Sequence, residues 1–390
     1  MVNNNFYATI NSLVAKASGV SDSGIIDYSS FIEAGKKITD IQYTDLQNNF
    51  ITSLMNRISF VINTARSYDG AYAELTRGNI EMGNTIELII QKFYDAEAAE
   101  FINLTNGQSV DQYKIYKPQV DVDYYVDTVA YKIPITIQYD QLKKAFESPA
   151  SMETFISGVI MYVMNSNELR RENGRIALVA DLIVKLSSET AATDSNEPAQ
   201  NYPLLTLYNA ITNAGLTADK ALYNEEFVKY AVKTIKQVTE KTKKVSTSYN
   251  KTGIKTFTKP ENRHLFVNSA VVSSMEAYIK TNNYNPEASM LKDYIDVPYW
   301  QSESAPFVVT YANPDFDPET AESEENPKTL TTAPVLAVMC DKFAIGEYVR
   351  KQDMRTSPFN ANGEYWNNFL NVELKYLTCD SANAVIFTLS

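Results

Sequence analysis

The longest regular pattern of apolar and polar positions lies between residues 149 and 187. Apolar or small side chains recur there at intervals of three and four, as on one face of an α-helix: Phe155, Val159, Tyr162, Ser166, Leu169, Asn173, Ile176, Ala180, Ile183 and Ser187. Pro149 and Ser151 predict where this helix begins. A helix over 152–186 would be about 50 Å long. We therefore interpret it as a spine against which other elements pack.

Strands are predicted both before and after this helix in the sequence. Within 120–142, apolar residues such as Val122 and Tyr124 alternate with aspartates, and Pro134 breaks this strand or places it at an edge. A polar connector, 187–203, predicts a domain boundary, with a second domain from Leu204. Further helices are predicted at 225–238 and 269–280, and further strands at 265–267, 334–340, 369–376 and 384–387. This mixture indicates an α+β fold.

Residues 67–91 carry a pattern that one compact domain does not explain. Three glycines punctuate the segment, and apolar residues recur at Leu75, Ile80, Met82, Ile86 and Leu88. Isolated two-stranded hairpins are marginally stable in water, and loops beyond about 12–15 residues are usually functional or disordered. We interpret the segment as an out-and-back hairpin that lies on a neighbouring copy of the same chain.

Composition narrows the classes of protein. A chain of 390 residues with 44% hydrophobic content is long enough for two or three domains. A net charge of −12 disfavours nucleic-acid binding over the whole surface. We expect no secretory signal in the first 15 residues and no membrane span, because no run of about 18 apolar residues occurs. Cys340 and Cys379 are expected to be buried free thiols of a reducing cytoplasm.

Charge is distributed unevenly along the chain. From Lys229 to Lys259 there are nine lysines and one acid, whereas 315–325 contains six acids and no base. The simplest interpretation is two solvated faces. The alternatives are lysines that face a nucleic acid, or an electrostatic interface between copies. The residues of that interface would be Lys241, Lys243 and Lys244 on one side and Asp315, Glu322 and Glu324 on the other.

No catalytic, cofactor or metal motif stands out. His264 is the only histidine, so a Ser-His or Cys-His pair would have to use it, and no G-x-S-x-G turn occurs. The chain has too few His and Cys residues for a zinc site, and Asp121-Val122-Asp123 lacks the glycine and closing glutamate of a calcium loop. We therefore expect no catalytic residue, no cofactor and no metal.

Six short blocks resemble, in the same order, the capsid proteins of small podophages of the phi-twenty-nine type. These blocks are NFITSLMNRI (49–58), GNIEMGNTIE (78–87), YDAEAAE (94–100), LKKAF (142–146), YWN (365–367) and ANAV (382–385). The order of the predicted parts also resembles the capsid fold of the Hong Kong 97 type. The resemblance covers 49–186 and 334–387 well, and the rest of the chain poorly.

The resemblance implies a division into parts. These are an N-terminal arm (1–48), a helix that leads to the E-loop (49–66), the E-loop hairpin (67–92), a peripheral domain with the spine helix (93–190), an axial domain (191–345) and closing strands of the peripheral domain (346–390). E-loop residues would contact a neighbouring subunit: Leu75, Arg77, Ile80, Met82 and Ile86.

The implied function is that of a major head protein. Such a protein self-assembles into pentamers and hexamers of an icosahedral or prolate shell around double-stranded DNA. Its partners would be further copies, a scaffolding protein, a portal protein and the packaged DNA, with no membrane. It would be located in the virion, and in the host cytoplasm during assembly. The alternatives are a soluble acidic enzyme such as a glycoside hydrolase, with the hairpin as a lid, or another virion component such as a head fibre or tail part.

Two departures from the family pattern carry expectations. Members of the group can have an immunoglobulin-like domain after the last strand, and we expect none here because Ser390 follows Phe387 so closely. Some capsids of this fold join an E-loop lysine to an asparagine of a neighbour. Residues 67–91 contain no lysine, so we expect a non-covalent shell.

Overall fold

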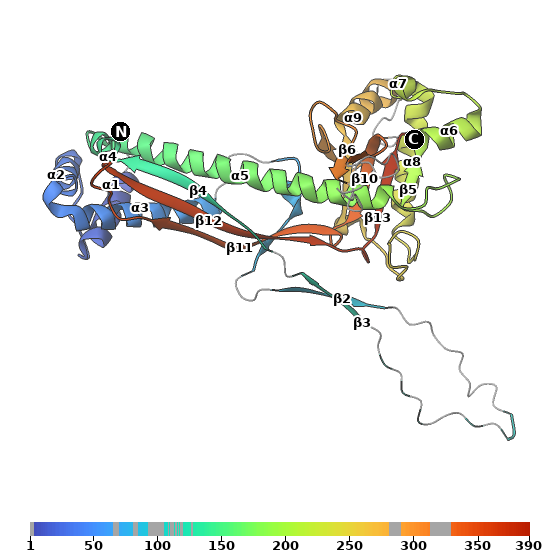
Figure 1. The fold of residues 1–390 in the computed structure, drawn as a ribbon, viewed down its shortest axis with the longest axis horizontal. Coiled ribbons are helices and arrows are strands. Elements are labelled where there is room, and N and C mark those ends of the chain that lie inside the picture. Colours follow the sequence, from blue (N-terminus) through green and yellow to red (C-terminus); the bar gives the residue numbers. More distant parts are fainter. Residues whose placement is uncertain are drawn as a thin grey trace, which may run out of the picture. The chain divides into compact units, whose positions relative to one another are not determined.

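The computed structural model describes residues 4–64, 70–80, 85–92, 105–107, 120–125, 128–280, 290–312 and 329–390, with four single positions between 109 and 117. Its elements form two compact units (Figure 1). The first unit contains Met1–Met82, Asp127–Arg175 and Glu347–Lys375, and the second contains Gly83–Val126, Ile176–Gly346 and Tyr376–Ser390. Helices and strands mix in both, as the predicted α+β class requires.

The N-terminal residues are helical and packed, so the prediction of an extended arm over 1–48 is wrong for residues 4–48. They form α1 (Asn4–Ser18) and α2 (Tyr28–Ile38), which contact α3 (Thr44–Thr64). Ile10 and Phe31 are completely buried, and the Phe31 and Phe146 rings lie 5.6 Å apart. The apolar residues that look isolated in the sequence are therefore the inner faces of short amphipathic helices.

A four-stranded sheet organises the first unit. Its order is β1 (Thr76–Asn79), β11 (Ile345–Thr356), β12 (Tyr365–Thr378) and β4 (Val129–Gln138). β1 runs parallel to β11, and β12 pairs with β4 in antiparallel register. Pro134 lies on the edge strand β4, as predicted, and α4 (Tyr139–Ala145) follows that strand. The long strand β11 was absent from the sequence prediction.

The predicted spine helix is confirmed as α5 (Pro149–Ser187). It begins earlier than expected, because the Ser148 hydroxyl accepts the backbone N–H of Ser151 at 3.1 Å and so caps the first turn. The predicted apolar face is wrong in its middle part, where Leu169 and Asn173 are exposed. The buried positions there are polar or charged: Asn167, Glu168, Arg171, Glu172 and Arg175. A search for apolar spacing alone does not find such a face.

The second unit is built on a five-stranded sheet. Its order is β5 (Asn201–Pro203), β13 (Ala384–Thr388), β10 (Val335–Asp341), β6 (Arg263–Asn268) and β7 (Ile295–Val297). Its helices are α6 (Leu204–Thr212), α7 (Ala218–Ala221), α8 (Glu225–Lys241) and α9 (Ser269–Met275), which continues in a π-helical turn (Glu276–Lys280). The predictions of α8, α9, β6, β10 and the last two strands are confirmed.

Two further strands belong to neither of the large sheets. β2 (Ile86–Gln91) pairs with β3 (Val120–Tyr125), from Ile86 opposite Tyr125 to Gln91 opposite Val120. We call this pair the ribbon. A hairpin closed within 67–91 is therefore wrong, because β1 joins the sheet beside β11 and the partner of β2 is β3. β8 (Thr310–Ala312) and β9 (Thr329–Thr331) form another small sheet.

Candidate assembly surfaces and the buried ionic cluster

One face of the ribbon lies toward the second unit, to which the ribbon belongs. Its strand β2 lines a cavity of about 290 Å³ together with Phe257 and Phe343. The Tyr125 hydroxyl donates to the carbonyl oxygen of Thr378 at 2.8 Å, which attaches the end of β3 to the same unit. The cavity and this hydrogen bond show that one side of the ribbon borders its own unit.

The other face of the ribbon is apolar and exposed. Because side chains alternate along a strand, Ile89, Val120 and Tyr124 project from the same side. Their exposed fractions are 58%, 43% and 63%. A two-stranded ribbon is marginally stable alone, so its exposed apolar side chains make this face a candidate for contact with a partner.

Both cysteines are buried and neither forms a disulfide, as predicted. Cys379 lies beside the ribbon, with its Sγ atom 4.0 Å from a carboxylate oxygen of Asp123. Burial raises the pKa of the Cys379 thiol, so the group stays protonated and unreactive at neutral pH. These thiols therefore act as small apolar side chains in the packing.

The predicted E-loop residues have different environments. Leu75 is completely buried within its own chain, so its assignment to a subunit contact is wrong. Arg77, Ile80 and Ile86 are partly exposed, and Met82 lies outside the described residues. The backbone N–H of Ile80 donates to the Val349 carbonyl at 2.9 Å. The segment that precedes the ribbon is thus part of the first unit.

A buried ionic cluster holds this segment. Glu347 of β11 bridges two guanidinium groups, with 2.6 Å from its Oε1 to Arg171 Nε and 2.5 Å from its Oε2 to Arg175 Nε. Arg175 Nη1 also lies 2.6 Å from Glu168 and 3.3 Å from Glu172. All five side chains are at most 8% exposed. Burial disfavours the charge of Arg175, but the carboxylates of Glu347 and Glu168 outweigh it and raise the pKa of Arg175.

Three contacts join the cluster to residues 72–76, which precede the ribbon in the sequence. The Thr76 hydroxyl accepts from Arg171 at 3.3 Å and from Arg175 at 3.0 Å. The backbone N–H of Tyr72 points to a Glu172 oxygen at 3.4 Å. Residues 72–76 are therefore fixed to α5 by charged groups inside the first unit.

Gly70 provides a test of this packing. A Cβ atom at Gly70 would lie 2.0 Å from a Glu172 oxygen, and that side chain is only 8% exposed, so it has little room to move away. We expect Gly70→Ala to lower the free energy of unfolding by about 1–3 kcal/mol, the usual range for overpacking. The matched control is Gly158→Ala on α5, where nothing lies within 4 Å of the new methyl group. Denaturant titration should show that the control is neutral or stabilised, and equal losses in both would contradict the packing.

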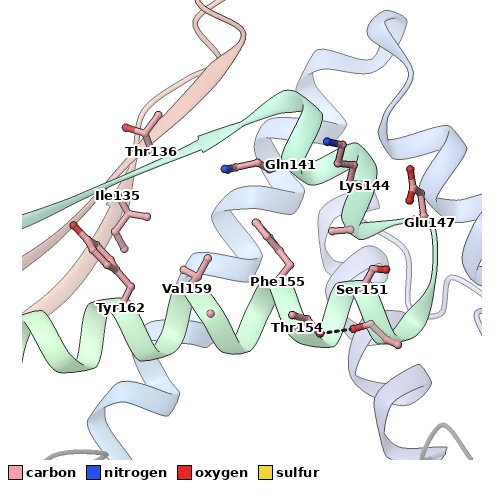
Figure 2. A pocket seen from close by; sticks show the side chains of 13 residues that line it. Ile135, Thr136, Gln141, Lys144, Glu147, Ser151, Thr154, Phe155, Val159 and Tyr162 are labelled. Atoms are coloured by element: carbon pink, nitrogen blue, oxygen red, sulfur yellow. Dashed lines mark hydrogen bonds between the residues drawn. The ribbon is translucent and has the colours of Figure 1, made fainter.

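An open groove of about 750 Å³ lies between β4, α4 and the first turns of α5 (Figure 2). Phe155, Val159 and Tyr162 project from α5 along it. The only charged side chains in its lining are Lys144 and Glu147. The groove thus lacks the two facing carboxylates that the glycosidase alternative requires.

Of the residues predicted to form an electrostatic interface, only the three lysines lie within the described residues. Lys241 donates to the Asn196 carbonyl at 3.1 Å, Lys243 pairs with Glu240, and Lys244 is exposed. Asp315, Glu322 and Glu324 lie outside the described residues.

His264 is buried in β6 and stacks on Phe266 at 5.8 Å, which agrees with a structural residue. Within the described ranges, no group of three or more metal-binding side chains was found. The helices in those ranges likewise include none that is long and apolar enough to cross a membrane.

Comparison with known proteins identifies the family. The sequence profile of the Phi29-like phage major capsid proteins matches residues 26–388, almost the whole chain. The chain belongs to this family. Its members are structural proteins of phage heads, so membership favours the capsid interpretation over the soluble enzyme.

Individual relatives agree with the family assignment. The major capsid protein of Bacillus phage B103 is 26% identical over 348 residues, covering 88% of this chain and 64% of the relative. That of Bacillus phage PZA is 24% identical over 352 residues, with the same coverage. The chain therefore spans less than two thirds of the length of these relatives. The capsid structure of Staphylococcus phage Andhra has a TM-score of 0.53 at 10% identity, over 81% of this chain and 83% of that one. This likeness confirms the capsid fold of the Hong Kong 97 type.

The ionic cluster is the feature that sequence reasoning missed. The signal was present, because Glu168, Arg171, Glu172 and Arg175 follow each other at helical spacing on one face. Charged residues at that spacing usually form an exposed face. Only the burial of α5 at these positions distinguishes the two cases.

Proposed function

We propose that this chain is the major head protein of a phage and that many copies assemble into the shell that encloses double-stranded DNA. The supporting observation is the family match over residues 26–388. In this proposal the copies form pentamers and hexamers, with scaffolding and portal proteins as assembly partners. The protein is then located in the virion, and in the host cytoplasm before assembly.

Assembly of the purified chain tests the proposal. Light scattering and negative-stain microscopy, with and without the scaffolding protein of the same phage, should detect shells, tubes or rings. A monomer that stays monodisperse under both conditions, and that hydrolyses a member of a glycoside panel, would instead support the enzyme alternative.

We assign the exposed face of the ribbon to a contact between copies. The support is its three exposed apolar side chains, Ile89, Val120 and Tyr124, on a two-stranded sheet. Arg77, Ile80 and Ile86 adjoin this contact in the proposal. The segment enclosed by the ribbon strands contains Lys92, Lys114 and Lys117, so the absence of lysine from 67–91 no longer argues against a covalent bond between copies.

The lysine-rich part of the second unit provides a separate prediction. If Lys241, Lys243 and Lys244 meet the acidic segment 315–325 of a neighbouring copy, their joint replacement by Ser should slow assembly at low salt. The difference from wild type should shrink at high salt, because salt screens exposed charges beyond about 10 Å at 0.1 M. Light scattering across a salt series measures both effects. Replacement of Lys36 and Lys37 on α2 is the control, and identical assembly at every salt concentration would favour a solvated face.

A further inference from the structure

The ionic cluster contains more acid than base. Three carboxyl groups, of Glu168, Glu172 and Glu347, face the two guanidinium groups of Arg171 and Arg175. A buried carboxylate that has only weak contacts is unfavourable, so the acid with the longest contacts is the weakest member of the cluster.

Glu172 is that member by geometry. Glu347 accepts two contacts of 2.5 and 2.6 Å from arginines, and Glu168 accepts one of 2.6 Å. Glu172 has only longer contacts, 3.3 Å to Arg175 and 3.4 Å to the Tyr72 N–H. Its carboxyl group also lies directly against the backbone of Gly70. The weakest acid of the cluster is thus the one that contacts the chain before the ribbon.

We propose that the cluster is a latch that fixes residues 70–80 to α5, and that the charge on Glu172 controls how firmly this segment is held. Protonation of Glu172 removes a buried charge that has only long contacts. Ionisation restores this weakly paired charge beneath Gly70 and Tyr72 and loosens the segment. That this affects the ribbon, and through it contacts between copies, rests on the proposed function.

The direction of the pH dependence follows from the groups around Glu172. Burial raises the pKa of Glu172 and outweighs the Tyr72 N–H and Arg175, which lower it, while Glu168 adds to the rise. The other charged groups of the cluster are Arg171 of α5 and Glu347 of β11. A carboxyl group with a raised pKa stabilises the folded contact at low pH and loses this effect as pH rises through the raised pKa. The latch should therefore be tighter in mild acid.

Hydrogen exchange on the unassembled full-length chain tests the latch. The backbone amides of Ala73 and Leu75 donate to the carbonyl oxygens of Gly70 and Tyr72, and that of Ile80 donates to Val349 of β11, so their peptides report the opening of this segment. After correction for intrinsic exchange rates, protection of 70–80 should fall from about pH 5 to about pH 8, by at most about tenfold per pH unit for one proton. Peptides from β10, in the second unit, should show no such trend.

Two variants test whether the charge on Glu172 itself controls the segment. Glu172→Gln keeps the shape and removes the charge, so its protection should equal that of wild type in mild acid at every pH. Glu153→Gln makes the same change at an exposed position of α5 and should keep the wild-type profile.

Three outcomes would overturn the latch. They are protection of wild type that does not change with pH, a pH dependence that persists in Glu172→Gln, and loss of the dependence in Glu153→Gln. Whether wild type forms shells is measured separately, so failure of the proposed function and failure of the latch are distinguishable.

Discussion

Replacing residues 92–119 by the dipeptide Asn-Gly should give a subunit that folds but does not close into shells. Gln91 and Val120 are cross-strand partners, so a two-residue turn can join them without changing the register of the ribbon. The two large sheets and the spine helix do not include the removed segment. Circular dichroism and gel filtration should therefore detect a folded, soluble chain, and microscopy should detect no closed particles.

The physical reason is the number of equivalent contacts in a shell. An apolar side chain that becomes fully buried contributes about 1.5–3 kcal/mol. The removed segment has two such side chains, Tyr113 and Ile115, which are 87% and 79% exposed, and the same contact would recur in every copy. A loss that hardly affects one subunit therefore becomes decisive for a closed particle.

A point variant makes the test independent of the deletion. Ile89→Asp with Tyr124→Asp places charge on the exposed face and should also abolish shells, whereas Glu87→Gln on the same face should permit them. Normal particles from both the deletion and the double variant would exclude the ribbon from the contact. Unfolding of the double variant as a monomer would mean that this face is part of the subunit core.

Glu347→Ala should destabilise the first unit by about 3–5 kcal/mol, since it leaves two buried guanidinium groups without their shared carboxylate. Its matched control is Glu373→Ala on the neighbouring strand β12. Glu373 pairs with Arg350 at 2.8 Å, but the two side chains are 27% and 35% exposed. Exposed pairs contribute roughly 0–1 kcal/mol, so the control should lose little stability.

The two tryptophans permit this measurement in one unit at a time. Trp366 is buried in the first unit and donates to Asn48 at 2.8 Å, whereas Trp300 is buried in the second. In a Trp300→Phe background, urea titration followed by fluorescence reports the first unit alone. This separation matters because a chain of two units need not unfold in one step. A loss in Glu347→Ala no larger than in Glu373→Ala would mean that the cluster does not stabilise the unit.

The prediction of the fold from sequence succeeded where one physical signal dominated. The spine helix, α8 and the fully buried strand β10 have strong periodicity or continuous apolar runs, and all were predicted. The N-terminal helices were missed because they are short and because asparagine, serine and threonine interrupt their apolar residues. Their helical state depends on packing against α3, which local propensity does not contain.

For the candidate site too, the sequence indicates features that depend on local pattern and misses those that depend on contacts between distant residues. The sequence indicated an irregular excursion between Leu75 and Leu88, but not that β1 would pair with β11 and β2 with β3. Those pairings join residues far apart in the sequence. Burial of Glu347 opposite Arg171 and Arg175 joins positions more than 170 residues apart, so no local pattern could predict it.

The strand edges of the two large sheets suit a protein that accumulates in many copies. In the first unit, one edge carries Pro134, which offers no N–H, and the other is the four-residue β1, whose pairing shifts at Gly78. In the second unit, both edge strands have only three residues. Short or proline-bearing edges resist the strand-to-strand aggregation that threatens β-rich proteins at high concentration. Copies of this chain can therefore be crowded together before assembly with little risk that their large sheets fuse into insoluble aggregates.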